Sequence, residues 1–349
     1  MDRRLVVLSL FALAACASGD APAGTADSTA RADSGAGSGI TAAGGTPATA
    51  ATAATTGAAA AGPGGGATPN QLGKVPVIEY HVIGGNKNTL YTRTAASYRD
   101  DLEQAYKMGY RPITISQLLD KDFSDVPAGM SPIVVVYDDA SDSQFRYVER
   151  NGKLEIDPTS GMGIWLDFAK SHPGWTTGNA VYCMLNGGAV GHNFFGDNPK
   201  WGGQKKEWRH LKVKWLADNG FELCSHTLWH ARLDKYSDAV VQEQFARNVM
   251  GIDSAVAGYK VRTMALPYGI WPKNRALASQ GSWTDPKTGK THSYKFDAVL
   301  EVAGGPNESP YDPKFESKSI NRIEAIGDDI VKTLRRLSEN NTRFVVGAR

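Results

Sequence analysis

Short hydrophobic runs and segments of helical periodicity alternate along most of the chain. The short runs predict strands at residues 74–81, 112–115, 133–136, 180–185, 221–224, 261–266, 296–300 and 343–346. Apolar positions three and four apart predict helices at residues 94–109, 164–171, 208–220, 237–258 and 330–337. Ser116 is expected to cap a short turn at 117–119. The segments 142–180 (apart from the helix at 164–171), 187–204 and 281–291 are predicted to be irregular or loop. Strands alternating with helices from residue 73 onward predict a single barrel-like α/β domain.

The residues before this pattern have a different composition. Arg3 and Arg4 precede an apolar stretch at 5–14, which is too short to span a bilayer, and the sequence then reads Leu-Ala-Ala-Cys16. These residues resemble the lipobox of bacterial lipoproteins, which implies a signal peptide at 1–15 and a lipid on Cys16. The alternative is an ordinary secretory signal with a chance cysteine. Residues 16–72 are rich in Ala, Gly and Thr, which predicts a flexible linker before a catalytic domain at 73–349.

The lipobox reading predicts a protein of the cell envelope, anchored to a bacterial membrane and facing the periplasm or the exterior. Ala17 follows the cysteine, so an outer membrane stays open as the location. The formal net charge is +2 and no run of lysine or arginine forms a basic patch, so nucleic acid is not an expected partner. The protein is expected to be a monomer. Cys183 and Cys224 fit either a disulfide or two buried thiols.

Two groups of residues carry candidate chemistry. Asp138 and Asp139 directly follow the β-branched run at 133–136, where buried carboxylates are costly unless something uses them. A pair of aspartates capping the next helix is the simpler alternative. His226 and His230 follow another strand candidate, and histidines four apart on a helical turn face the same side and can hold one metal ion.

Three motifs in this order resemble those of the polysaccharide deacetylases of the NodB type, carbohydrate esterase family four. The first is Val-Tyr-Asp-Asp-Ala at 136–140, where the family has Thr-Phe-Asp-Asp-Gly. The second is His-Thr-Leu-Trp-His at 226–230, and the third is Leu-Pro-Tyr-Gly at 266–269. Each follows a strand candidate, which makes the set more specific than any one motif.

The resemblance implies a distorted (β/α) barrel and a divalent metal held by Asp139, His226 and His230. Zn²⁺ is the expected ion, with Co²⁺, Ni²⁺ and Mn²⁺ as alternatives. Asp138 would be the general base, and the backbone N–H of Tyr268 would help to bind the oxyanion. Such a metal can polarise an acetyl carbonyl and lower the pKa of a bound water.

The chain departs from the commoner family pattern at two points. It lacks the Leu-x-x-His motif near the C-terminus, and Ala265 stands where an arginine is usual. In both departures the chain resembles the branch that deacetylates poly-N-acetylglucosamine. In that branch a Tyr-His motif near the N-terminus supplies the catalytic histidine. Tyr80-His81 matches that motif, so His81 is the expected general acid, with a core histidine as the alternative.

The same branch has a C-terminal arginine that supports the catalytic aspartate, and Arg322 is the matching residue. Trp229, Pro267 and Trp271 are candidate sugar contacts, although core packing explains either tryptophan as well.

The expected activity is metal-dependent deacetylation of an N-acetylated polysaccharide, such as an N-acetylglucosamine-containing glycan of the envelope, with release of acetate. One alternative is an O-acetyl esterase acting on a glycan. Another is a carbohydrate-binding lipoprotein with impaired catalysis, since the C-terminal histidine is missing. A glycosidase with paired carboxylates ranks last because it leaves His226 and His230 unexplained.

Overall fold

The computed structural model describes residues 66–187, 192–197, 199–200 and 203–348. The predicted signal peptide, Cys16 and the linker up to residue 65 lie outside the described residues, so those predictions stay open. Within the described part of the chain, every helix is too short or too polar to cross a membrane.

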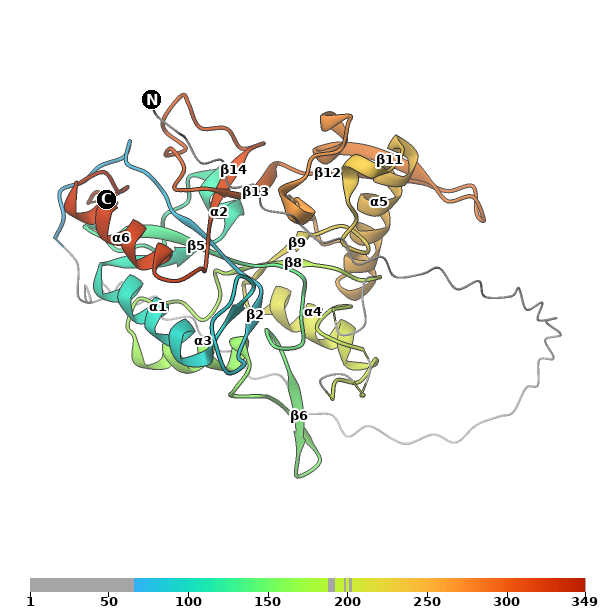
Figure 1. The fold of residues 1–349 in the computed structure, drawn as a ribbon, viewed down its shortest axis with the longest axis horizontal. Coiled ribbons are helices and arrows are strands. Elements are labelled where there is room, and N and C mark those ends of the chain that lie inside the picture. The colour runs from blue at the N-terminus through green and yellow to red at the C-terminus, as the bar shows by residue number, and fades with distance from the viewer. Residues whose placement is uncertain (1–65, 188–191, 198, 201–202, 349) are drawn as a thin grey trace, which may run out of the picture. The chain divides into compact units, whose positions relative to one another are not determined.

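Seven parallel strands of the described chain close into a barrel, which confirms the predicted distorted (β/α) barrel (Figure 1). In order around the barrel they are β1 (Val77–Tyr80), β14 (Ile320–Glu324), β13 (Ala298–Gly304), β10 (Thr263–Ala265), β9 (Glu222–Ser225), β8 (Val181–Met184) and β5 (Ser131–Tyr137). The ring is distorted at β5. Its one edge pairs with β1, and its other edge is shared between β8 and β4 (Tyr110–Ile113).

Side chains of successive strand residues point to opposite faces, and this alternation divides the core into two layers. On β5, Val134 and Val136 belong to an inner cluster, whereas Val135 and Tyr137 belong to an outer one. The outer cluster also contains the apolar faces of the flanking helices, so it lies between barrel and helices. The inner cluster therefore fills the barrel.

Helices surround the strands in Figure 1. They are α1 (Ala95–Lys107), α2 (Ile115–Asp120), α3 (Gly161–Ser171), α4 (Trp208–Asp218), α5 (Asp238–Ala255) and α6 (Asp329–Glu339). Thr94 caps α1, since its side chain accepts a hydrogen bond from the backbone N–H of Ser97. The prediction of Ser116 as a cap was wrong. Thr114 caps α2 because it forms a capping box with Gln117.

Several segments predicted as irregular contain short strands. The hairpin β6 (Tyr147–Arg150) and β7 (Lys153–Ile156) projects from the barrel in Figure 1, and β11 (Gln280–Thr284) with β12 (Thr291–Lys295) forms another. In the second hairpin, Tyr294 packs against Phe245 of α5, which a glycine-rich composition does not reveal. The predicted strand at 343–346 was also wrong: this segment makes only isolated bridges, to Lys74 and Asn70.

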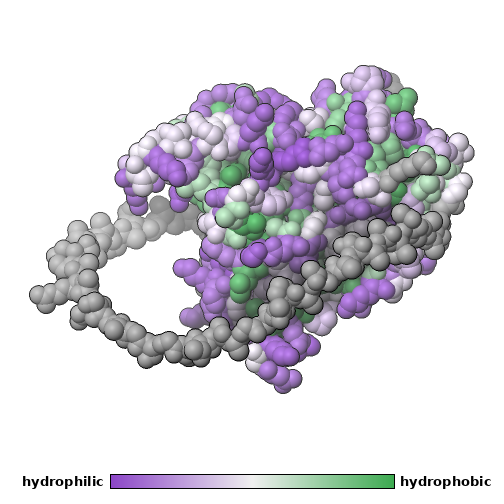
Figure 2. Space-filling model, turned by 180° about the vertical axis from the view of Figure 1, so that it is seen from behind, coloured by the Kyte–Doolittle hydropathy of each residue, from purple (hydrophilic) through white to green (hydrophobic). Residues whose placement is uncertain are grey.

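The remaining elements are short. They are β2 (Val82–Ile83), β3 (Thr92–Arg93) and the 3₁₀ turns η1 (Leu233–Lys235), η2 (Pro267–Gly269) and η3 (Arg275–Ala278). Figure 2 shows hydrophilic and hydrophobic residues interspersed over the face seen from behind.

Cys183 and Cys224 form a disulfide that joins β8 to β9. The two residues are direct partners in the strand register, and both side chains are fully buried in the inner cluster. Of the two alternatives that the sequence left open, the structure has the disulfide.

Candidate active site

The site lies where the inward-facing rows of the barrel reach the carboxyl ends of the strands. Glu79 of β1 and His81, directly after that strand, follow Val77 at every second position, and Asp138, directly after β5, follows Val136 in the same way. The backbone N–H of Asp138 donates to the carbonyl of Tyr80, which fixes the ends of these two strands side by side. A polar site therefore continues directly from the apolar interior.

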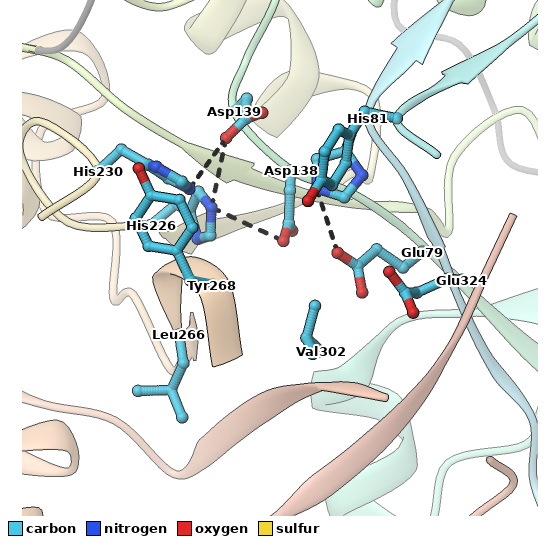
Figure 3. A pocket seen from close by; sticks show the side chains of 11 residues that line it. Glu79, His81, Asp138, Asp139, His226, His230, Leu266, Tyr268, Val302 and Glu324 are labelled. Atoms are coloured by element: carbon cyan, nitrogen blue, oxygen red, sulfur yellow. Dashed lines mark ion pairs between the residues drawn. The ribbon is translucent and has the colours of Figure 1, made fainter. Parts of the chain in front are cut away.

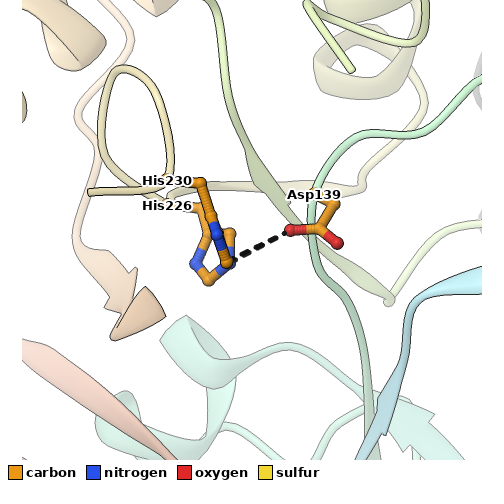
Figure 4. A group of neighbouring side chains, drawn as sticks. All are labelled: Asp139, His226 and His230. Atoms are coloured by element: carbon orange, nitrogen blue, oxygen red, sulfur yellow. Dashed lines mark ion pairs between the residues drawn. The ribbon is translucent and has the colours of Figure 1, made fainter. Parts of the chain in front are cut away.

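Asp139, His226 and His230 meet at one point of this mouth (Figure 4). Asp139 Oδ1 lies 3.4 Å from His226 Nε2 and 3.5 Å from His230 Nε2. The three ligand atoms all lie within 4.8 Å of one another. One carboxylate oxygen and two imidazole nitrogens in this arrangement can serve as three ligands of a single cation.

The backbone that presents these three residues is unusual. Residues 226–230 form a turn, so the predicted helical turn was wrong. Thr227 and His230 adopt left-handed conformations, with φ of 67° and 60°, and Asp139 does the same with φ of 74°. These values bend the chain sharply, which lets both histidines face Asp139 without a helix.

The environment of His226 fixes which ring nitrogen is available. His226 is buried, and its Nδ1 lies 2.9 Å from the carbonyl oxygen of Ala265, to which it donates. The Nε2 lone pair is then directed at Asp139, as in histidines that bind metals. Asp139 Oδ1 and His226 Nε2 are both buried without a hydrogen-bond partner in the described chain. Because such orphaned atoms are costly, these residues fit a bound divalent cation.

Charges at the site shift the pKa values of the ligand residues. Burial alone raises the pKa of Asp139, but the facing imidazoles of His226, His81 and His230 outweigh it and hold that pKa well below its usual range. Burial, aided by His226, lowers the pKa of His230 to about 4. His230 is therefore a neutral imidazole at neutral pH, the form that can bind a metal.

Asp138 has a different partner from its neighbour. The Nη1 of Arg322 donates to both carboxylate oxygens of Asp138, at 2.8 and 2.9 Å, and both side chains are almost completely buried. Burial raises the pKa of Asp138, but Arg322, followed by His226, outweighs this and holds that pKa below its usual value. The carboxylate is thus ionised, and its Oδ2 lies 3.7 Å from His226 Nε2.

A cavity of about 320 Å³ opens over these groups. Figure 3 shows His226, His230 and Tyr268 on one side of it and His81, Glu79 and Glu324 on the other, with Asp138 between them. The Tyr268 side chain is 55% exposed and lies against the ring of His230, with centroids 4.3 Å apart. The ring of Tyr268 is therefore accessible to a ligand in the cavity.

Comparison with known proteins shows what the fold and part of the sequence are similar to. No curated protein sequence matches the chain. The family model described as polysaccharide deacetylase matches residues 179–281, which include His226, His230 and the Pro-Tyr-Gly turn. The chain carries a polysaccharide deacetylase domain. The matched segment is thus similar to hydrolases that remove acetyl groups from polysaccharides.

Solved structures show the same fold as the deacetylase domain. The deacetylase PplD of Streptococcus pyogenes, solved with acetate, is 14% identical, with a TM-score of 0.50 over 77% of this chain and 98% of its own. IcaB from Ammonifex degensii is 15% identical, with a TM-score of 0.50 over 77% of this chain and 98% of its own. A polysaccharide deacetylase from Bacillus cereus is 16% identical, with a TM-score of 0.50 over 76% and 69%.

The deacetylase domain does not bring all of the predicted site residues together. Tyr268 lines the cavity, but the residues that line it do not include Trp229, Pro267 or Trp271. Trp271 is half-buried and donates from Nε1 to Glu301, 2.9 Å away. Sugar contact by these three residues remains a prediction.

Other residues of the cavity were missed by the sequence reasoning. Glu79 and Tyr91 line it, one deep in the wall and the other 53% exposed at the rim. Glu79 had a readable signal, because a residue two before His81 on a strand shares its face. Tyr91 had no such signal in the sequence. It lies directly before the short strand β3, and only the folded chain brings its ring against that of His81.

Proposed function

We propose that the chain is a metal-dependent deacetylase that hydrolyses N-acetyl groups of a polysaccharide containing N-acetylglucosamine and releases acetate. The observation that carries this proposal is the meeting of Asp139, His226 and His230 around buried atoms that lack partners, beside the ionised Asp138. The family supplies the reaction class, and the site supplies the groups that the reaction needs.

Asp139, His226 and His230 would hold the metal, and Zn²⁺ suits one carboxylate and two imidazoles. When bound, such an ion supplies a Lewis acid for the acetyl carbonyl and for a water molecule. The protein's part is to present both imidazoles in the correct orientation. Ala265 orients His226 by accepting its Nδ1–H, which leaves Nε2 facing the other ligand residues.

Asp138 is the proposed general base. An amide is a poor electrophile, so the attacking water must lose its proton as it attacks. Asp138 can accept that proton because Arg322 keeps it ionised and directs its carboxylate toward the ligand residues. The amide of Gln144 donates to the backbone carbonyls of both Asp138 and His81, which holds the two catalytic positions relative to each other.

The tetrahedral intermediate carries a negative charge on the former carbonyl oxygen. We propose that the backbone N–H of Tyr268 donates to this oxygen. Tyr268 adopts a left-handed conformation, with φ of 58°, inside the Pro-Tyr-Gly turn that follows β10. The turn thereby carries its backbone to the edge of the cavity, above His230.

His81 is the proposed general acid. As the C–N bond breaks, the leaving nitrogen takes the electron pair and needs a proton to depart as an amine. His81 lies across the cavity from the metal-binding residues, on the far side of Asp138 in Figure 3. Base and acid thus face a bound acetamide group from two directions.

The setting of the enzyme is part of the proposal. The lipobox-like sequence ending at Cys16 supports a monomeric lipoprotein of the cell envelope, with a linker that lets the domain reach a glycan near the membrane. The disulfide is in keeping with an oxidising compartment outside the cytosol.

The test compares metal content and acetate release for four forms of the full chain: wild type, Asp138→Asn, His226→Ala and the control His292→Ala. His292 stacks on Trp283 in the β11–β12 hairpin, away from the cavity. With an N-acetylglucosamine oligomer, the wild type and His292→Ala should bind about one zinc per chain and release acetate. Asp138→Asn should keep the metal and lose turnover, and His226→Ala should lose both.

A wild type that binds no metal would refute the ligand assignment. Acetylated xylan as a second substrate tests which acetyl linkage is hydrolysed. Acetate released from xylan and not from the oligomer would mean that the enzyme acts on O-acetyl esters and not on N-acetyl amides. Metal binding without turnover on either glycan would favour a carbohydrate-binding protein.

A further inference from the structure

Glu79 is a buried carboxylate that is neither a proposed metal ligand nor the proposed general base. It lies inside the barrel mouth on β1 and is only 1% exposed, yet both of its carboxylate oxygens lack a hydrogen-bond partner in the described chain. Burying a carboxylate is costly unless nearby cations or donors compensate. Its neighbours therefore indicate what it does.

Two groups compensate Glu79, and both belong to the proposed catalytic machinery. Its Oε1 lies 3.3 Å from His81 Nε2, and its Oε2 lies 3.2 Å from Arg322 Nε. Arg322 uses Nη1 for Asp138, so one guanidinium spans the two carboxylates. Glu79 is thus joined directly to the proposed acid and through Arg322 to the proposed base.

The strand geometry holds Glu79 in this place. As residues i and i+2 of an extended segment, Glu79 and His81 direct their side chains to the same face. The backbone carbonyl of Glu79 accepts from Ala325, and its register partner on β14 is Glu324. A fixed backbone and a buried side chain leave the carboxylate little freedom to turn away from the imidazole.

Burial disfavours the charged form of both members of the pair, and charges nearby oppose it. Burial raises the pKa of Glu79 well above its usual value, against the opposing effect of Arg322. Burial also lowers the pKa of His81, against the opposing charges of Asp138 and Asp139. Arg322 and His226 also face His81 and lower its pKa.

We propose that Glu79 is the positioning residue of the general acid: its carboxylate receives the Nε2–H of His81 and so fixes the ring for proton delivery. This inference rests on the proposed function. The other ring nitrogen of the imidazolium then gives its proton to the leaving amine as the C–N bond breaks. His81 is left neutral, with its remaining proton on Nε2 facing Glu79. Glu79 itself touches no reacting atom.

A purely structural role, in which Glu79 only balances the charge of Arg322, makes a different prediction. Loss of that balance would disturb Asp138 and slow every substrate alike. A defect confined to the acid slows only substrates whose leaving group must be protonated. An N-acetylated sugar amine requires that proton, whereas 4-nitrophenolate departs from 4-nitrophenyl acetate without it.

The experiment measures kcat of the metal-loaded full chain on an N-acetylglucosamine oligomer and on 4-nitrophenyl acetate. General acids typically contribute about 10²- to 10⁴-fold, so we expect Glu79→Gln to lower amide turnover at least tenfold and ester turnover less than about twofold. His81→Gln should show the same split more strongly. Because the two residues act as a unit, the double variant should be no slower than His81→Gln alone.

Glu324→Gln is the matched control, since it removes a carboxylate from the same cavity on the neighbouring strand without removing the one that faces His81. Its ratio of amide to ester turnover should equal that of the wild type. Should Glu79→Gln not fold, Glu79→Asp tests the same point: it keeps the charge, shortens the reach to His81 and should also lower amide turnover selectively.

Equal losses on both substrates for the Glu79 variants would overturn the inference, as would a double variant whose defect is the product of the two single ones. If His81→Gln shows the split and Glu79→Gln does not, only the role of Glu79 fails. If His81→Gln also lacks the split, the acid assignment in the proposed function fails with it.

Discussion

Arg322 is the cation on which two buried carboxylates depend, so its removal should be costly to the fold. In Arg322→Met, Asp138 and Glu79 stay buried, each 1% exposed, without their shared counter-charge. The two hydrogen bonds to Asp138 at 2.8 and 2.9 Å are charge-assisted. Such bonds contribute about 1.5–3 kcal/mol each, and breaking a buried ion pair by deleting one partner costs about 3–5 kcal/mol. We expect a loss of about 3–5 kcal/mol at pH 7.

The assay is urea unfolding of wild type and Arg322→Met between pH 5 and 7.5. In the variant, Asp138 loses the cation that holds its pKa low, so burial raises that pKa above its unfolded value of about 3.9. The pKa of Glu79, which burial already raises in the wild type, rises further above its unfolded value of about 4.3. A raised folded-state pKa stabilises the fold below the unfolded pKa, and that contribution is lost as the pH rises. The deficit should therefore be larger at pH 7.5 than at pH 5.

Arg99→Met is the matched control, because Arg99 pairs with Asp167 at 3.0 Å on the surface. Exposed pairs contribute at most about 1 kcal/mol, so its unfolding free energy should change little at any pH. A loss below about 1 kcal/mol for Arg322→Met, or a deficit that is the same at both pH values, would refute the reasoning about buried charge.

Three further predictions concern other parts of the molecule. Burial lowers the pKa of Lys212 to about 7, so between about pH 7 and 10 the unfolded chain binds a proton that the folded chain does not. The unfolding free energy should rise with pH in that range by up to about 1.4 kcal/mol per unit, and urea titrations of Lys212→Met should show a flatter profile. Replacing Cys183 and Cys224 together by alanine opens a crosslink between residues 41 apart, which should lower the unfolding free energy by about 2–4 kcal/mol; an unchanged urea midpoint would contradict this. Tyr91 is 53% exposed at the rim beside His81, where it can stack on a sugar ring, so Tyr91→Ala should raise KM for an N-acetylglucosamine oligomer about tenfold and leave kcat nearly unchanged. Tyr91→Phe should restore the KM, and a fall in kcat on its own would instead assign Tyr91 to holding His81.

The parts of the fold that could be predicted are those whose local pattern has a single reading. The β-branched run that became β5 cannot be a surface helix, and the aspartates after it mark a carboxyl end of a strand. β14 was missed for the opposite reason. Its inward face carries Arg322 in place of an apolar residue, so the alternation that identifies a strand is broken where the site begins.

The site was predictable in its residue types and less so in its geometry. The motif places His226 and His230 near each other, but their spacing suggests a helix, and only the tertiary structure reveals a turn with left-handed residues. The same holds for Glu79, whose position on a strand face could be read from the sequence although its pairing with Arg322 could not. Those two residues lie far apart in the sequence, on β1 and β14, which only the closed barrel makes neighbours.

The left-handed residues around the metal group also bear on how this protein can be improved. Asp139, Ala140, Thr227, His230 and Tyr268 all have positive φ, at a cost of about 1–3 kcal/mol for each strained residue. A screen for heat resistance alone would favour glycine or asparagine at all five. Ala140 can accept glycine, since it supplies no proposed ligand, whereas Thr227 would lose the hydrogen bond that its Oγ1 accepts from the backbone N–H of Ala231. At Asp139 and His230 the same gain in stability removes the side chain that the strained backbone presents, so a screen without an activity filter would select against the enzyme.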